Sequence, residues 1–173
     1  MYGLHTEQLS AYILDCAERN DSQHIDYYMS YGGNAHLKDH LGRNAAHLFA
    51  LKSNTQGLDQ IALNDLKAFE VFDDAGLTPL MYLAQNSAVN VAPYVEEWPQ
   101  LLLQANNHGH TVAGFLAARG QTESIIKNLL PLCPEIAHQK VIAMVMASTT
   151  LSPKEKLTHA KLLADAGFTP QVI

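Results

Sequence analysis

Asp73-Asp-Ala-Gly76-Leu-Thr-Pro-Leu-Met-Tyr-Leu-Ala84 is the stretch that decides the fold, because similar phrases stand before and after it. The earlier copy, Asp39 to Ala50, reads Asp-His-Leu-Gly-Arg-Asn-Ala-Ala-His-Leu-Phe-Ala. The later copy, Asn106 to Ala117, reads Asn-Asn-His-Gly-His-Thr-Val-Ala-Gly-Phe-Leu-Ala. The glycines at 42, 76 and 109 are 34 and then 33 residues apart. A recurring phrase at this period predicts an array of stacked repeats.

The period, with a turn followed by a helix start similar to Thr-Pro-Leu-His-x-Ala, resembles the ankyrin-repeat family. The resemblance covers roughly residues 11–130 and is weaker afterwards. It implies an all-α, ankyrin-repeat-like solenoid of about five helix pairs with hairpin-like turns, in a single domain over residues 1–173. The expected repeats are an N-terminal cap at about 1–38, central repeats at 39–72, 73–105 and 106–134, and a degenerate C-terminal cap at 135–173. Terminal repeats are expected to be atypical because each exposes one face to water.

Individual residues predict how each repeat is built. The three glycines suit a tight turn with positive φ. Asn44, Thr78 and Thr111 are expected to cap the helices that follow them, with Pro79 at a first helical position. Asn20 stands where the family usually has glycine, and asparagine tolerates the left-handed conformation expected there. The stretch 90–104 is the weakest helical signal because Pro93 and Pro99 interrupt it.

The C-terminal part predicts two further helices. After Pro131 and Pro134 a new helix is expected near Glu135, with an apolar stripe formed by Ile136, Val141, Ile142 and Val145. Ser152-Pro-Lys-Glu155 is a capping box that begins the last helix, and Gly167 ends it. The expected buried face of this last helix consists of Leu157, Ala160, Leu163 and Ala164.

Composition narrows the classes of partner. The chain has 173 residues with 11 basic and 17 acidic side chains, for a net charge of −6. This balance argues against nucleic-acid binding through phosphate contacts and is compatible with a basic protein partner. No signal peptide and no apolar run long enough for a membrane span is visible, and the two cysteines suit a reducing compartment. We therefore expect a cytoplasmic protein, with delivery into another cell left open.

The residues with reactive side chains favour structural roles. His36 and His40, or His108 and His110, could offer two metal ligands per hairpin, fewer than a zinc site needs, so no metal or cofactor is expected. His47 matches the histidine that, by the resemblance, links neighbouring loops through hydrogen bonds. Cys16 is expected to be a packed thiol. Cys133 is expected in an exposed turn, where a Cys133–His138 nucleophile is the enzymatic alternative.

The acidic pairs Asp73-Asp74 and Glu96-Glu97 could be imagined as a general acid and base. Adjacent carboxylates are more often part of a solvated surface, and that is the role expected of both pairs.

The resemblance implies that a partner is held by the hairpin tips and the concave face of the first helices. The expected partner-binding residues are Leu37, Lys38, His40, Leu41, Arg43, Phe72, Asp74, Leu77, Gln85, Asn86, Asn107, His108, His110 and Arg119. Apolar side chains at such positions, rimmed by polar ones, are typical of a protein interface.

The function expected from this surface is non-enzymatic binding of one protein partner, and the chain is expected to be a monomer or part of a hetero-complex. An inhibitor or immunity protein that neutralises a toxin or enzyme fits this description. A host-directed bacterial effector or an adaptor with the same surface is the alternative. A Cys/His enzyme and a self-assembling structural protein are less favoured.

Overall fold

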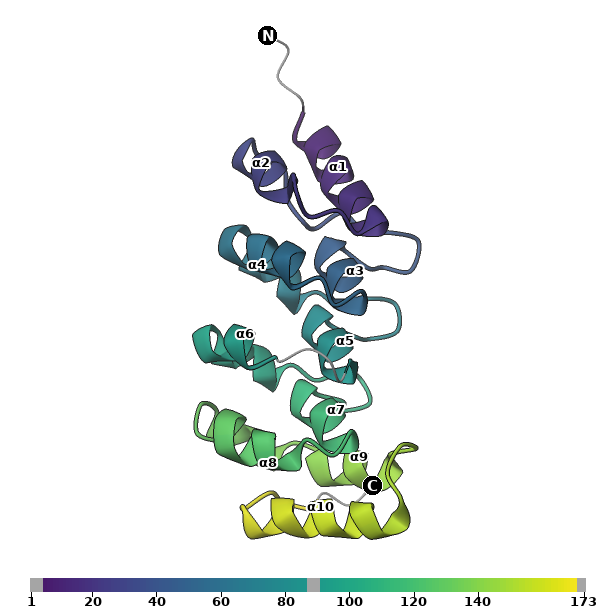
Figure 1. Cartoon of the computed structure of the whole chain (residues 1–173), viewed down its shortest axis with the longest axis vertical. Coiled ribbons are helices and arrows are strands. Elements are labelled where there is room, and N and C mark those ends of the chain that lie inside the picture. The colour runs from purple at the N-terminus through teal and green to yellow at the C-terminus, as the bar shows by residue number, and fades with distance from the viewer. Residues whose placement is uncertain (1–4, 87–90, 171–173) are drawn as a thin grey trace. The chain divides into compact units, whose positions relative to one another are not determined.

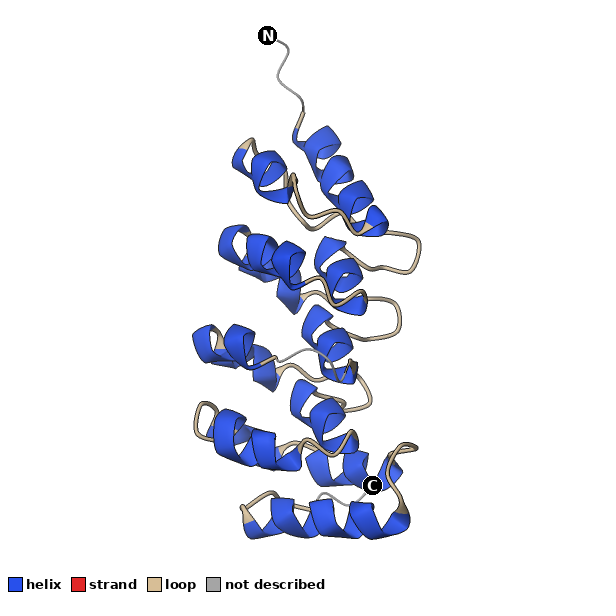
Figure 2. Cartoon of the chain, in the orientation of Figure 1, coloured by secondary structure: helices blue, strands red, loops and turns tan. Residues whose placement is uncertain are grey.

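The computed structural model describes residues 5–86 and 91–170. Every regular element within these ranges is a helix, and none is a strand (Figure 2). The all-α prediction is therefore confirmed. No helix of the described ranges is long and apolar enough to cross a bilayer. The chain divides into two compact units, Met1–Leu83 and Ala84–Ile173.

The first unit is built from paired helices. It contains α1 (Thr6–Arg19), α2 (Ile25–Ser30), α3 (Ala45–Leu51), α4 (Thr55–Asn64) and the 3-10 helix η1 (Leu66–Glu70), and α5 (Pro79–Gln85) crosses the boundary to the second unit. Helices α1 and α2 lie side by side, as do α3 and α4, and α1 also packs against α3 (Figure 1). The core is formed by fully buried side chains, among them Ile13, Ile25, Phe49, Leu58 and Ile61.

The second unit has shorter and less regular helices. It contains α6 (Ala92–Glu97), the 3-10 helix η2 (Pro99–Leu103), α7 (Val112–Ala118), α8 (Thr122–Ser124), the π-helical η3 (Ile125–Leu129), the 3-10 helix η4 (Pro134–His138), α9 (Val141–Ala147) and α10 (Pro153–Asp165). Helix α9 packs against both α7 and α10. Its core includes Leu101, Leu102, Ile125, Val141 and Val145, all with no exposed surface.

The predicted helix starts are confirmed by their cap hydrogen bonds. The side-chain oxygens of Asn44, Thr78 and Thr111 accept from the backbone N–H three residues later, at 3.1, 3.4 and 3.1 Å. The capping box at the start of α10 is also present, since Glu155 Oε2 accepts from the N–H of Ser152 at 2.8 Å. These bonds satisfy N–H groups that have no partner inside the helix.

The predicted breaks in the chain also occur. Asn20 ends α1 with φ of 60° and ψ of 33°, the left-handed conformation expected of it. Helix α6 is short, and Trp98 separates it from η2, as the prolines of this stretch predict. Asn90, the first residue of the weak stretch, lies outside the described residues.

Two predictions for the C-terminal part are wrong. No single helix begins near Glu135, because extended backbone at Gln139 (φ −82°, ψ 164°) separates η4 from α9. In α10 only Leu163 is buried, whereas Leu157 is 65 % exposed and Ala164 is exposed. Helix α10 packs against α9 and α8 and buries a narrower stripe than its sequence pattern suggests.

Candidate functional site

The three tips that were expected to bind a partner are built in the same way. Asp39, Asp73 and Asn106 each begin a hairpin, and one side-chain oxygen accepts hydrogen bonds from the backbone N–H groups two and four residues later, at 2.8–3.0 Å. Three residues further on, each turn has a glycine with φ of 74°, 72° or 77°, as the sequence predicts. The recurring Asp or Asn therefore fixes the tip backbone, leaving the residues between the fixed points to vary.

In the first unit the two tips are bonded to one another. The N–H of Asp74 donates to the carbonyl of Leu41 at 3.1 Å, and Lys38 Nζ donates to the carbonyl of Phe72 at 3.2 Å. A Cβ added to Gly42 would approach the backbone N of Asp74 to 2.9 Å, which shows how closely the tips pack. The two hairpins therefore form one continuous, cross-linked surface.

Apolar side chains stand on this surface in contact with water. Leu37, Leu41 and Phe72 are 43 %, 45 % and 36 % exposed. Leu77, which was expected to be exposed, is half-buried instead. We define the tip surface of the first unit as these predicted residues together with their polar neighbours: Leu37, Lys38, His40, Leu41, Phe72, Asp74 and Leu77.

Arg43 was predicted to bind the partner, but its side chain is held within the hairpin. Arg43 Nη2 lies 2.7 Å from Asp39 Oδ2, and Nε donates to the same oxygen at 2.8 Å. The hydrogen bonds from Arg43 lower the pKa of Asp39, against the opposing effect of burial. Arg43 therefore stabilises the charged form of the residue that organises the turn.

The predicted residues of the second unit differ in exposure. Asn107, His108 and Arg119 are exposed, whereas Gln85, Asn86 and His110 are half-buried. The ring of His110 lies 5.7 Å from that of Phe115 and 5.7 Å from that of His108, between centroids. Burial, with a smaller contribution from His108, lowers the pKa of His110. His110 therefore serves partly as a packing residue in this tip.

Asp73 does not belong to a solvated acidic pair, and that prediction is wrong. Its side chain is buried, and Oδ2 accepts a hydrogen bond of 2.6 Å from the hydroxyl of Tyr82. Burial and this bond raise the pKa of Tyr82 to about 12. Asp74, Glu96 and Glu97 are exposed, as expected. The sequence did not predict the burial of Asp73, because its hydrogen bond to Tyr82 on α5 forms only when the hairpin packs against that helix.

His47 links neighbouring loops, as the resemblance predicts. The ring is fully buried, and Nε2 donates to the carbonyl of Leu77 at 3.0 Å, while Nδ1 accepts from the N–H of Asn44 at 3.2 Å. Burial lowers the pKa of His47. A neutral ring with both nitrogens bonded acts as a fixed connector between the first two tips.

The thiol of Cys133 is buried, so the prediction that it lies exposed is wrong. Its Sγ donates to Glu135 Oε2 at 3.4 Å, and its residual exposure is 4 %. Burial and the neighbouring carboxylate raise the pKa of Cys133. Since the thiolate is the nucleophile, this environment opposes the proposed Cys/His chemistry. Cys16 is buried, as expected.

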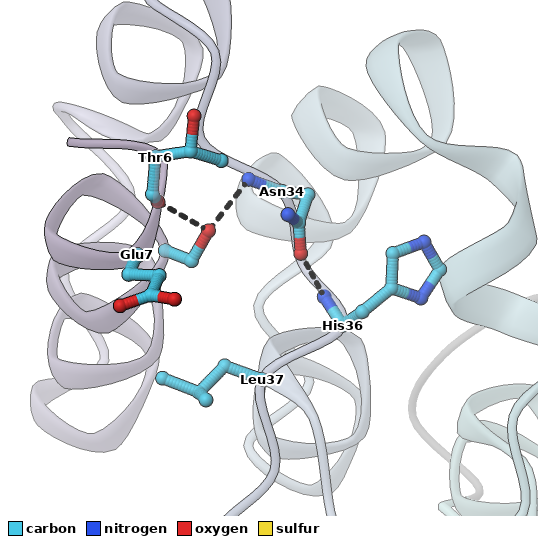
Figure 3. A pocket seen from close by; sticks show the side chains of 6 residues that line it. Thr6, Glu7, Asn34, His36 and Leu37 are labelled. Atoms are coloured by element: carbon cyan, nitrogen blue, oxygen red, sulfur yellow. Dashed lines mark hydrogen bonds between the residues drawn. The ribbon is translucent and has the colours of Figure 1, made fainter.

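A shallow pocket of about 440 Å³ opens between the first turn of α1 and the segment 34–37 (Figure 3). Ser10 Oγ accepts from the N–H of Asn34 at 3.0 Å, which ties the two sides together. The His36 ring points away from Glu7 and Leu37 and bonds to Asp65 at 3.1 Å. Sequence reasoning had singled out Leu37 here but missed the contribution of α1, which comes from residues far away in sequence.

Within residues 5–86 and 91–170, no three His, Cys, Asp or Glu side chains come together as metal ligands. Comparison with models of known protein families gives no match, and comparison with curated proteins gives no significant one.

Proposed function

We propose that this chain is an ankyrin-type solenoid that binds one protein partner without catalysing a reaction. Three tips with the same side-chain and backbone hydrogen bonds, at a period of 34 and 33 residues, support the assignment of the repeat. The links from His47 to Leu77 and from Leu41 to Asp74 support stacking of successive repeats in the first unit.

The observation that carries the binding proposal is that apolar side chains are exposed on the tip surface, whose two hairpins are joined by hydrogen bonds. The carbonyls of Leu41 and Phe72 each accept a hydrogen bond from the other hairpin, and Leu37 is exposed next to Lys38, which makes one of these bonds. Apolar anchors on rigid backbone are typical of binding surfaces, because little conformational freedom is lost when the partner docks. The polar rim of Lys38, His40 and Asp74 supplies the directional contacts.

The residues with perturbed pKa values support a binding role over catalysis. His47, Asp39 and Tyr82 are engaged in holding the hairpins, and the pKa of Cys133 is shifted away from reactivity. In an enzyme, such groups would be expected to face a cleft where substrate binds. We infer a neutralising role, as in an inhibitor or immunity protein, whose net charge of −6 favours a basic target.

The test is to identify the partner by affinity capture from the native source and then to measure its affinity for variants. Phe72→Asp and Leu41→Asp each place a charge in the tip surface, and we expect at least about tenfold weaker binding. Leu63→Asp is the matched control, because Leu63 is 78 % exposed and lies on α4 outside the tip surface. Full affinity in both tip variants would refute the proposed surface.

A further inference from the structure

Four tyrosines form a second exposed surface in the first unit. Tyr12 lies on α1 and is 45 % exposed. Tyr27 lies on α2 and is 55 % exposed, and Tyr31, at the C-terminal cap of α2, is 68 % exposed. Tyr28, also on α2, is half-buried. Ring centroids lie 5.6 Å apart for Tyr12 and Tyr28, 5.6 Å for Tyr27 and Tyr28, and 4.7 Å for Tyr27 and Tyr31. We call these residues the tyrosine cluster.

The helical spacing of the sequence places these rings on one surface. Tyr27 and Tyr31 are four residues apart and therefore neighbours, while Ile25 and Met29 of α2 are buried. Contact between Tyr12 and Tyr28 joins α1 to α2 across their packing interface. Each ring is supported by another ring, so the surface is pre-organised before any partner arrives.

Most of the chain's net charge lies in the segment that contains these two helices and the loop between them. Residues 6–31 contain five acidic residues and one basic residue, a net charge of −4 out of −6 for the whole chain. The basic residue, Arg19, is already paired with Asp15 at 2.5 Å. Of the acidic residues, Glu7, Glu18 and Asp26 are exposed. An aromatic surface in an acidic surrounding is complementary to a cation.

We propose that the tyrosine cluster is a docking surface for an arginine-bearing segment of a protein partner. A guanidinium group stacks on the face of a tyrosine ring and is attracted by its electrons, while the carboxylates of α1 and α2 attract the positive charge over a longer range. Phosphate-bearing nucleic acid is repelled by the same carboxylates. A second copy of the chain would bring two acidic segments together, which opposes self-association.

The part of the tyrosine cluster on α2 lies away from the tip surface. In the first unit, α2 lies on the side opposite the hairpin loops that follow residues 38 and 72 (Figure 1). The proposal for the tyrosine cluster does not depend on the tip surface. If the tyrosine cluster does not bind arginine, the proposed function of the tip surface is unaffected.

The experiment measures the binding of fluorescein-labelled oligoarginine and oligolysine peptides of equal length to the full chain by fluorescence anisotropy. We expect oligoarginine to bind more tightly than oligolysine, because only the guanidinium group is planar and stacks. Tyr27→Ser combined with Tyr31→Ser should weaken oligoarginine binding about tenfold, while Tyr27→Phe with Tyr31→Phe should retain it within about twofold. Leu63→Ser, which changes an exposed side chain on α4 without adding a charge, should leave it unchanged.

The single variant Tyr31→Ser guards against a fold defect, because this side chain is the most exposed of the four. It should weaken oligoarginine binding about threefold and leave the thermal unfolding midpoint unchanged. Equal affinity for the two peptides, with no effect of the serine variants, would show diffuse charge attraction and overturn the proposal. A dimer of the wild-type chain in sedimentation, lost in the serine variants, would assign the cluster to a second copy and also overturn it.

Discussion

At the scale of single residues, the buried His47 has a measurable pH signature. Its ring donates to the carbonyl of Leu77, and burial lowers its pKa below the usual value of about 6.5. In the unfolded chain the same side chain takes up a proton first as the pH falls. The stabilising contribution of the neutral ring is therefore complete above about pH 6.5 and is lost as the pH falls toward the lower pKa of the folded state.

Replacing His47 by Gln is expected to lower the free energy of unfolding by about 1–2 kcal/mol near neutral pH, because the carbonyl of Leu77 loses its partner or gains a poorer one. The variant should also lose less stability than the wild type between about pH 7.5 and about pH 5.5, since one titrating group is removed. Urea unfolding of both proteins at these two pH values measures the difference. Parallel pH dependences would contradict the assignment of a depressed pKa to His47.

Residue identity predicted local bonds well and burial less well. The caps by Asn44, Thr78 and Thr111 depend on backbone only three residues away, so their sequence context is sufficient. The burial of Asp73, in contrast, is accompanied by a hydrogen bond from Tyr82 on the next helix, nine residues away. Such packing leaves no short-range signal in the sequence.

At the scale of elements, the hairpin is a unit whose first residue needs an acceptor oxygen more than a charge. Asp39 and Asp73 are carboxylates, whereas Asn106 makes the same two bonds with an amide oxygen. One oxygen satisfies the two backbone N–H groups of the turn in every copy. Asparagine should therefore replace aspartate in this role with a small loss.

The matched pair Asp73→Asn and Asp73→Ala tests this requirement. Asn keeps the oxygen that accepts from Ala75 and Leu77, but its amide nitrogen cannot accept the hydrogen bond from Tyr82. We expect a loss of about 1 kcal/mol for Asn and about 2–3 kcal/mol for Ala, measured by urea unfolding. Equal losses would show that the bond to Tyr82, rather than the turn, determines the contribution of Asp73.

The irregular elements and the tyrosine cluster mark the limits of sequence reasoning at this scale. The π-helical η3 and the 3-10 helix η4 have the apolar spacing of ordinary helices, so their geometry was not predicted. The tyrosine cluster did leave a signal, namely four tyrosines between positions 12 and 31. It was missed because the family resemblance directed attention to the tips.

At the scale of the whole molecule, distant hydrogen bonds connect residues that are about one repeat apart. Lys52 Nζ donates to the carbonyl of Ala17, 35 residues earlier, and Asn64 donates to Asp26, 38 residues earlier. In the second unit, Ser148 donates to the carbonyl of Ala118 over 30 residues. Contacts of this range couple neighbouring helix pairs, so stability is expected to be a sum of local terms and nearest-neighbour terms.

This arrangement predicts that a core defect loosens its own unit first. Phe49 and Val145 are both fully buried, one in each unit. Phe49→Leu and Val145→Ala should each cost about 1–3 kcal/mol. In hydrogen-exchange mass spectrometry, Phe49→Leu should accelerate exchange in peptides from residues 6–64 and leave 141–165 near the wild-type rate, and Val145→Ala should do the reverse, because local opening precedes global unfolding. Even acceleration across the chain in both variants would instead show that the two units unfold as a single cooperative body.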